Sequence, residues 1–151
     1  MLFYSRLFLD LCFNHWEGKV AETQKIFKIL IIEDDPVTQK LVARMLTGAG
    51  YETSLASNGV EALEMIVSAQ PDLIVSDVMM PEMDGFTLLY ALRSNPQTAN
   101  IPVIMLTARA SGDDILDGID MGANDYIPKP FHPEELLASV KERLAHLKTS
   151  I

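Results

Sequence analysis

Short apolar segments alternate with amphipathic segments along most of the chain. Runs of aliphatic and β-branched residues predict buried strands over residues 28–32, 51–57, 73–76, 102–106 and 125–127. Apolar residues at helical spacing predict helices over residues 36–48, 59–69, 86–93, 113–121 and 133–147. Strands that alternate with helices in this way favour an α/β fold, in which helices cover both faces of a parallel sheet.

Local signals support several of these boundaries. Asp35 precedes Pro36, and this pair is typical of a helix N-cap followed by proline in the first turn. Gly48 and Gly50 are expected to end the same helix. In the helix over 59–69, the spacing predicts one apolar face formed by Val60, Leu63, Ile66 and Val67.

Composition limits the possible classes of protein. A chain of 151 residues, 48% of them hydrophobic, is sufficient for one globular domain. Its single cysteine, Cys12, allows no internal disulfide and fits a reducing compartment. No apolar run reaches the length of a membrane span, and we expect residues 1–13 to be neither a signal peptide nor an anchor. These features together favour a cytoplasmic protein.

Charge is distributed unevenly along the chain. The net charge is −9, and the first 27 residues are neutral, so residues 28–151 carry the whole excess of acid. A surface of this sign repels phosphates, so we expect no direct binding to nucleic acid. It suits a cation such as Mg²⁺, or a basic protein partner.

The predicted strands deliver reactive side chains to one edge of the sheet. Ligands in open α/β sheets bind beyond the carboxyl ends of the strands. At this edge, strand 28–32 is followed by the acids Glu33, Asp34 and Asp35, and strand 73–76 by Asp77. Strand 102–106 is followed by Thr107, and strand 125–127 leads to Lys129. Each residue alone is an ordinary cap, turn or surface residue. Carboxylates gathered together repel one another unless a cation joins them, and hard oxygen ligands suit Mg²⁺.

Four sequence stretches resemble the receiver domain of two-component response regulators, the CheY-like family. They are KILIIEDDP, PDLIVSDVMMPEMDGF, PVIMLTARA and GANDYIPKPF. Their spacing also agrees, with 43 residues from Asp34 to Asp77, 30 more to Thr107 and 22 more to Lys129. The resemblance implies a doubly wound, flavodoxin-like sheet of five strands in the order 2-1-3-4-5, an order that CheY itself exemplifies. We expect this domain to span residues 28–148, followed by a short tail over 149–151.

The resemblance also implies roles for individual residues. Asp77 would accept a phosphoryl group, and Lys129 and Thr107 would bind it together with the backbone N–H of Ala108. Mg²⁺ would be held by carboxylates and by the backbone carbonyl of Met79; the carboxylates are those of Glu33, Asp34 and Asp77. Tyr126 would act with Thr107 as a switch. The Lys129–Pro130 bond is expected to be cis, and Gly85 is expected to permit a turn that closes the loop after Asp77.

The implied function is that of a phosphoacceptor in a phosphorelay. The donor would be a histidine kinase or a histidine phosphotransfer protein, and an unidentified output protein would bind the face formed by helix 113–121, strand 125–127 and helix 133–147. Enzymatic activity would be limited to autophosphotransfer and slow autodephosphorylation. Because Met79 and Arg109 are bulky residues that flank the site, we expect the phosphorylated state to persist for minutes to hours.

A phosphorylation-dependent dimer is a further expectation. The winged-helix class of regulators carries basic residues in two helices for this purpose. The corresponding residues here are Ile115 and Ser139, which argues against that mode of dimerisation. Lys141 and Arg143 are the nearest basic replacements.

The sequence argues against two other functions. A phosphatase of the haloacid dehalogenase type needs an acid two residues after its nucleophile, where this chain has Met79. Phosphate-binding glycine loops of nucleotide-binding domains are absent from the sequence. The alternative that stays open is a degenerate receiver that acts only as a docking module.

Residues 1–27 have no counterpart in the family pattern. They are rich in aromatic residues, which are Phe3, Tyr4, Phe8, Phe13, Trp16 and Phe27. One interpretation is a disordered or misassigned start. The other is an amphipathic segment that docks on this protein or another, because Phe3, Leu7 and Leu11 would share one face of a helix.

Overall fold

The computed structural model describes residues 25–108 and 122–149. These residues form, in chain order, β1 (Lys28–Ile32), α2 (Pro36–Gly48), β2 (Glu52–Ala56), α3 (Gly59–Ser68), β3 (Leu73–Asp77), α4 (Gly85–Ser94), β4 (Val103–Thr107), β5 (Asp125–Pro128) and α6 (Pro133–Thr149). The helix predicted over residues 113–121 lies outside the described residues. Among the described helices, none combines the length and the apolar character needed to cross a membrane.

The five strands form one parallel sheet in the order β2-β1-β3-β4-β5. This is the order that the sequence predicted. Ile32 at the end of β1 lies beside Ser76 of β3, and Asp77 lies beside Leu106 of β4. The carboxyl ends of the central strands therefore meet at one edge of the sheet.

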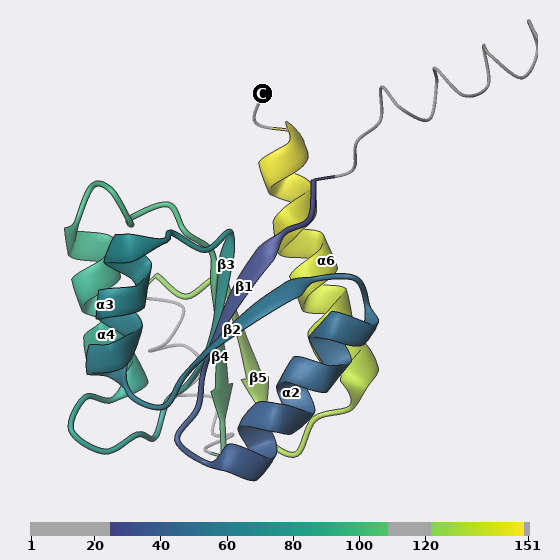
Figure 1. Ribbon diagram of the computed structural model, residues 1–151, viewed down its shortest axis with the longest axis horizontal. Helices are drawn as coiled ribbons and strands as arrows, with labels where there is room; N and C mark the ends of the chain where they lie inside the picture. Colours follow the sequence, from purple (N-terminus) through teal and green to yellow (C-terminus); the bar gives the residue numbers. More distant parts are fainter. Residues whose placement is uncertain (1–24, 109–121, 150–151) are drawn as a thin grey trace, which may run out of the picture.

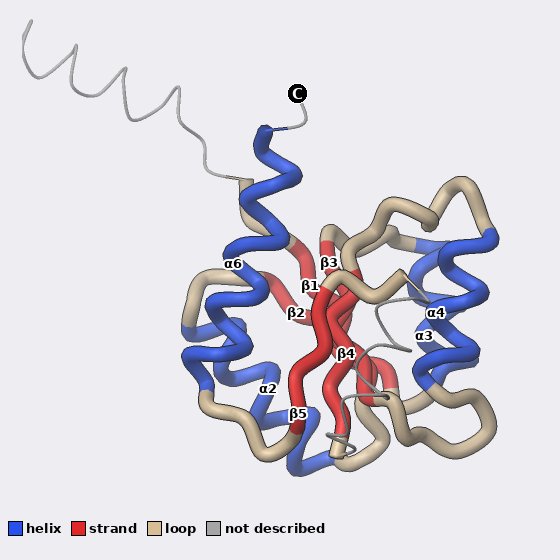
Figure 2. The backbone as a smooth tube through the Cα atoms, turned by 180° about the vertical axis from the view of Figure 1, so that it is seen from behind, coloured by secondary structure: helices blue, strands red, loops and turns tan. Residues whose placement is uncertain are grey.

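Helices cover both faces of this sheet. Figures 1 and 2 show α3 and α4 on one face and α2 and α6 on the other. Side chains of a strand point alternately to the two faces. Accordingly, Leu30 and Ile32 pack in the core under α3 and α4, whereas Ile29 and Ile31 pack in the core under α2 and α6. The central strands β1, β3 and β4 are mostly apolar and almost completely buried because both of their faces are covered.

Side-chain caps fix where the helices start. The Asp35 carboxylate accepts the Thr38 N–H at 3.1 Å, as the sequence predicted for the start of α2. The bonds from Thr38 lower the pKa of the Asp35 carboxyl. Asp84 caps α4 in the same way, accepting the Thr87 N–H at 2.7 Å. After α2, Gly50 adopts a φ of 97°, which favours glycine.

The apolar face predicted for the helix over residues 59–69, which is α3 in the structure, is wrong in part. Ile66 is fully buried, but Val67 is 80% exposed and Val60 is 46% exposed. The buried side of α3 instead includes Gly59 and Ala62. Residues in a helix are separated by roughly 100° about its axis, so a short helix can present small residues to the sheet and leave adjacent valines in solvent.

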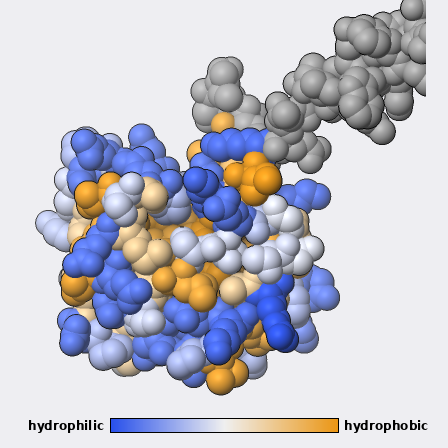
Figure 3. Space-filling model, viewed as in Figure 1, coloured by the Kyte–Doolittle hydropathy of each residue, from blue (hydrophilic) through white to orange (hydrophobic). Residues whose placement is uncertain are grey.

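The surface of the domain is mixed in character. On the face shown in Figure 3, hydrophilic residues surround several small hydrophobic areas. The exposed hydrophobic side chains include Val37 and Leu41 of α2 and Tyr90 of α4. Scattered apolar residues are normal on a protein surface, so only those beside a functional group carry meaning.

Candidate functional site

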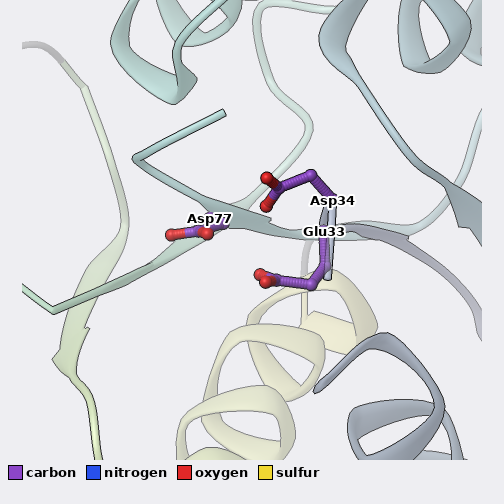
Figure 4. Close-up of side chains that lie close together, drawn as sticks. All are labelled: Glu33, Asp34 and Asp77. Atoms are coloured by element: carbon purple, nitrogen blue, oxygen red, sulfur yellow. The ribbon is translucent and has the colours of Figure 1, made fainter. Parts of the chain in front are cut away.

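Three carboxylates meet at the carboxyl edge of the sheet. Glu33 and Asp34 directly follow β1, and Asp77 is the last residue of β3. One carboxylate oxygen of each residue lies within 4.8 Å of those of the other two. Figure 4 shows the three side chains converging from the two neighbouring strands. Glu33 and Asp77 are buried, whereas Asp34 is exposed, so the cluster opens to solvent on the side of Asp34.

Lys129 completes the cluster from the opposite side. Its Nζ lies 3.1 Å from Glu33 Oε2 and 3.4 Å from Asp77 Oδ2. The residue directly follows β5, and its backbone N–H donates to the carbonyl oxygen of Thr107 at 2.6 Å. The Lys129–Pro130 peptide bond is cis, which confirms that prediction. The lysine that the sequence placed at this edge therefore contacts two of the three acids.

The site carries more negative charge than Lys129 balances. Burial and, after it, the neighbouring Asp77 carboxylate together raise the pKa of Glu33 to about 7, although Lys129 opposes both effects. A pKa raised in this way means that the ionised form of the Glu33 carboxyl is unfavourable at this position. A second cation, in addition to Lys129, would reduce the repulsion between these carboxylates.

The donor set fits Mg²⁺. This ion prefers carboxylate oxygens, and it usually keeps several waters rather than binding in a closed protein cage. Two buried acids and one exposed acid supply oxygen ligands while leaving one side accessible to water. Glu33, Asp34 and Asp77 are therefore the residues that would hold the ion.

The remaining predicted site residues lie around this cluster. Thr107 ends β4 and is completely buried, and Ala108 follows it at an exposed position. The Met79 N–H donates to Asp77 Oδ1 at 3.3 Å, and the Met79 side chain is 49% exposed. Tyr126 lies in the core on the α3 and α4 side of the sheet. All of these residues belong to the loops and strand ends at the same edge, except Tyr126, which lies within β5.

Gly85 is required for a different reason from the one that the sequence suggested. A Cβ atom at this position would lie 2.5 Å from the Asp77 carbonyl oxygen and 2.6 Å from Met105 Cε. Its φ is not in the positive range, since the positive-φ glycines among the described residues are Gly50 and Gly122. The close approach of α4 to the end of β3, not an unusual turn, therefore excludes a side chain here.

Gln39 contributes to the site without any sequence signal. Its side-chain Nε2 donates to the carbonyl oxygens of Glu33 at 3.2 Å and of Ala56 at 3.0 Å. It ties the acidic loop after β1 to the end of β2. A glutamine in an amphipathic helix is usually a surface residue, so only the folded arrangement reveals this bridge.

Comparison with known proteins agrees with this geometry. Residues 29–141 match the family model of the response regulator receiver domain. The chain belongs to this family, whose members typically bind Mg²⁺ at an acidic cluster and pair with histidine kinases.

Individual relatives support the same assignment. The chain is 47% identical over 117 residues to a DNA-binding dual master transcriptional regulator, RpaA, of Synechocystis, covering 78% of this chain and 48% of the relative. It is 46% identical over 121 residues to the response regulator MprA of Mycobacterium ulcerans, covering 80% of this chain and 51% of the relative. The chain thus spans about half the length of these curated relatives.

Solved structures show the same fold. A putative response regulator from Chloroflexus aurantiacus superimposes with a TM-score of 0.77 at 41% identity, covering 80% of this chain and 99% of that chain. The chemotaxis response regulator CheY4 of Vibrio cholerae gives a TM-score of 0.74 at 36% identity, covering 79% of this chain and 99% of that chain.

Proposed function

We propose that this chain accepts a phosphoryl group on Asp77 from a histidine kinase or a histidine phosphotransfer protein, with Mg²⁺ held at its acidic cluster. The observation that carries the proposal is the convergence of three carboxylates and Lys129 at one edge of the sheet. Asp77 ends the central strand β3 and lies 3.4 Å from Lys129, and it is the residue to which the resemblance to receiver domains assigns the acceptor role.

The chemistry is a transfer between two nucleophiles. A carboxylate oxygen of Asp77 attacks the phosphorus, and the phosphorus–nitrogen bond to the donor histidine breaks. The imidazole leaves with the bonding electron pair and takes up a proton. Such a reaction depends on in-line placement and on neutralisation of the phosphoryl oxygens more than on acid–base catalysis.

The protein supplies part of that neutralisation from residues already in place. Lys129 lies close enough to Asp77 to turn from Glu33 toward a phosphoryl oxygen. The Thr107 hydroxyl and the Ala108 N–H are proposed to bind the other oxygens. When bound, Mg²⁺ would offset the charge of the acids and of the incoming group.

The signal is proposed to leave the domain through protein contacts. Phosphorylation adds about two negative charges beside the acids, and this change would bias a switch formed by Thr107 and Tyr126. The responding face would comprise β5, α6 and the segment 113–121, which lies outside the described residues. The acidic charge of residues 28–151 does not favour direct contact between this domain and nucleic acid.

The internal packing of α6 also argues against the dimer mode that needs a basic residue at position 139. Ser139 is 5% exposed, and its hydroxyl donates to Asp125 Oδ2 of β5. A residue used in this way offers no charge to a second copy. Ile115 lies outside the described residues. A dimer through α6 would therefore depend on other residues, of which Lys141 is exposed.

The phosphodonor is proposed to dock on α2. This helix starts directly after the acidic residues, and it exposes 75% of Val37 and 51% of Leu41. These side chains line a shallow hollow of about 560 Å³ together with Lys40 and Arg44. Apolar residues beside basic ones, next to the acceptor, suit an apolar and acidic surface on the donor protein.

Incubation with a small acyl phosphate, followed by intact mass spectrometry, tests the acceptor assignment. The wild-type chain should gain one phosphoryl group only when Mg²⁺ is present, and Asp77→Asn should gain none. Asp72→Asn is the matched control, because Asp72 lies just before the opposite end of the same strand. It should be phosphorylated like the wild type.

Failure of both small donors and purified histidine kinases to phosphorylate the folded wild-type chain would contradict the proposal. It would favour the alternative of a docking module. Phosphorylation of Asp77→Asn at the wild-type level would instead move the acceptor to another residue.

Leu41→Glu tests the docking surface separately. It should slow transfer from a kinase at least tenfold and leave phosphorylation by the small acyl phosphate unchanged. Val67→Glu, an equally polar change at an exposed position of α3, is the control. Equal rates for both variants with the kinase would place the docking surface elsewhere.

A further inference from the structure

A groove lies at the amino end of the sheet, away from the acidic cluster. It has a volume of about 520 Å³, which is within the range of pockets that bind small ligands or a few large side chains. Its apolar lining comes from Phe27, Tyr51, Leu137 and Leu144. Lys25 and Lys141 add positive charge to it. Nothing in the proposed phosphoryl transfer uses this groove.

The chain enters the domain at the edge of this groove. Lys25, the first described residue, is part of the lining. Its Nζ pairs with Asp72 Oδ1 at 3.0 Å and lies 5.3 Å from the centre of the Phe27 ring. Figures 1 and 2 show that β1 begins beside the carboxyl-terminal half of α6, which supplies the other wall. Residues 1–24 are therefore attached at the edge of an apolar groove.

The attached segment has the composition that this groove would bind. Residues 1–24 contain five aromatic residues, which are Phe3, Tyr4, Phe8, Phe13 and Trp16. They carry three acids and two bases, and the stretch nearest to the groove along the chain has Glu17 and Glu22 against Lys19. This charge is complementary to Lys25 and Lys141. Apolar surface of this kind is unfavourable in water and favours association with another apolar surface.

The length of the segment permits the contact. Trp16 is nine residues before Lys25, and an extended chain spans about 3.3 Å per residue, so Trp16 can reach any part of the groove. A tethered segment also has an effective concentration in the millimolar range at its own site. It would therefore occupy the groove ahead of a free partner of similar affinity.

We propose that the groove between Phe27, Tyr51, Leu137 and Leu144 binds the chain's own residues 1–24, with the aromatic side chains of Phe13 and Trp16 in the apolar part. When it is bound, this segment covers the amino end of the sheet and the carboxyl-terminal half of α6. It makes residues 1–24 part of the folded domain rather than a separate arm.

Trp16 is the only tryptophan of the chain, so its fluorescence reports on this segment alone. In the native full-length chain, its emission should be shifted to shorter wavelength relative to the chain in urea. Quenching by acrylamide should be at least threefold weaker than in urea. Both properties should be independent of protein concentration, because the contact is within one chain.

Ala145→Glu tests whether the groove is the binding site. Ala145 is an exposed residue of α6 that lines the groove, so a glutamate there places a charge in it without disturbing the core. The emission should move to longer wavelength, and acrylamide quenching should approach the value in urea. Ala138→Glu, at an exposed position of the same helix outside the groove, should behave like the wild type.

Lys141→Glu provides a second variant on the groove and should release Trp16 partly. Circular dichroism should give the same helix content for all variants, so that a change at Trp16 reflects loss of docking. Emission and quenching of the native chain equal to those in urea would overturn the proposal. Equal protection in Ala145→Glu and Ala138→Glu would also overturn it, as would protection that appears only at high concentration, which would assign the groove to a second copy. The phosphorylation assay on Asp77 is independent of each of these outcomes.

Discussion

The two ends of the parallel sheet differ in how their charged side chains are paired. At the carboxyl end, three carboxylates lie together, and Lys129 is the basic residue that contacts two of them. At the amino end, Arg93 and Lys25 each have hydrogen-bond acceptors that match their donors. The same strands therefore connect a region of repulsion with a region of satisfied polar groups.

Arg93 illustrates the amino end. The half-buried guanidinium donates to the carbonyl oxygens of Gly122, Ala99 and Ile101, and its remaining donor reaches Asn124 Oδ1 at 3.0 Å. Burial lowers the pKa of Arg93. Because its acceptors precede β4 and β5, the side chain fixes the loops that lead into both strands. No like charge opposes it among these contacts.

Glu33 illustrates the carboxyl end, where burial and Asp77 raise its pKa to about 7. The comparison teaches that unfavourable like charges gather at the carboxyl end of the strands, whereas paired polar groups hold the amino end. Functional sites often keep an arrangement that costs stability, and the rest of the fold compensates for it.

The largest expected effect is at Asp77. Asp77→Asn should abolish phosphorylation and yet increase the free energy of unfolding of the metal-free protein by about 1 kcal/mol, because it removes repulsion with Glu33. Urea unfolding of both proteins in a chelating buffer measures the change. A loss of stability would mean that the pair with Lys129 outweighs the repulsion, and that this end of the sheet is not strained.

Arg93→Ala should have the opposite effects: it should lower the stability of the protein and leave phosphorylation unchanged. Removing the guanidinium leaves several carbonyl oxygens without their donor, so the free energy of unfolding should fall by about 3 kcal/mol. Phosphorylation measured well below the melting temperature should be unchanged. Arg44→Ala, at an exposed position of α2, is the control and should change stability by less than about 0.5 kcal/mol. Similar losses in both variants would remove the contrast between the two ends.

The carboxyl end was also the end that the sequence predicted well. Asp77, Thr107 and Lys129 could be placed because each follows an apolar run, and parallel strands bring their ends together. The pairing of Lys129 with Glu33 could not be predicted, since it depends on how a long side chain is directed in the folded protein. The reason for Gly85 was likewise missed, because a close approach between helix and strand leaves no local signal.

The contacts at the amino end of the sheet were harder to predict from the sequence. Arg93 looks like an ordinary basic residue in the last turn of a helix, yet its partners lie six to thirty-one residues further along the chain. The exposure of Val60 and Val67 had the same cause, because the side of α3 that packs on the sheet is set by tertiary contacts. Sequence patterns predict local structure and the order of the strands. Contacts between side chains that are distant in the sequence can be identified only in the folded structure.

A smaller effect is expected from pH. The folded protein holds the Glu33 proton more tightly than the unfolded chain, whose pKa is near the ordinary 4.5. Between about pH 4.5 and 7 the folded state therefore binds more protons, and stability falls as pH rises through this window. The whole shift corresponds to about 3 kcal/mol, since one pKa unit corresponds to about 1.4 kcal/mol. About 2 kcal/mol of it should be lost between pH 5 and 7 in the metal-free protein.

Urea unfolding at several pH values checks this prediction, with Glu33→Gln as the control. The variant should show a flatter dependence on pH, and Mg²⁺ should restore much of the wild-type stability at pH 8. If stability instead rose between pH 5 and 7 in both proteins, the charge of Glu33 would not be unfavourable at this site.

The smallest effect is expected at Asp72, which anchors the amino end. Its carboxylate accepts the Lys28 N–H at 2.8 Å and pairs with Lys25 at 3.0 Å. Asp72→Ala removes both contacts and should lower the free energy of unfolding by about 1 kcal/mol, whereas Asp72→Asn keeps an acceptor and should lose less than half of that. Salt should weaken only the difference between wild type and Asp72→Asn, because screening acts on the charge. An increase in stability in Asp72→Asn would reveal repulsion at the amino end too, and the division between the two ends would no longer hold.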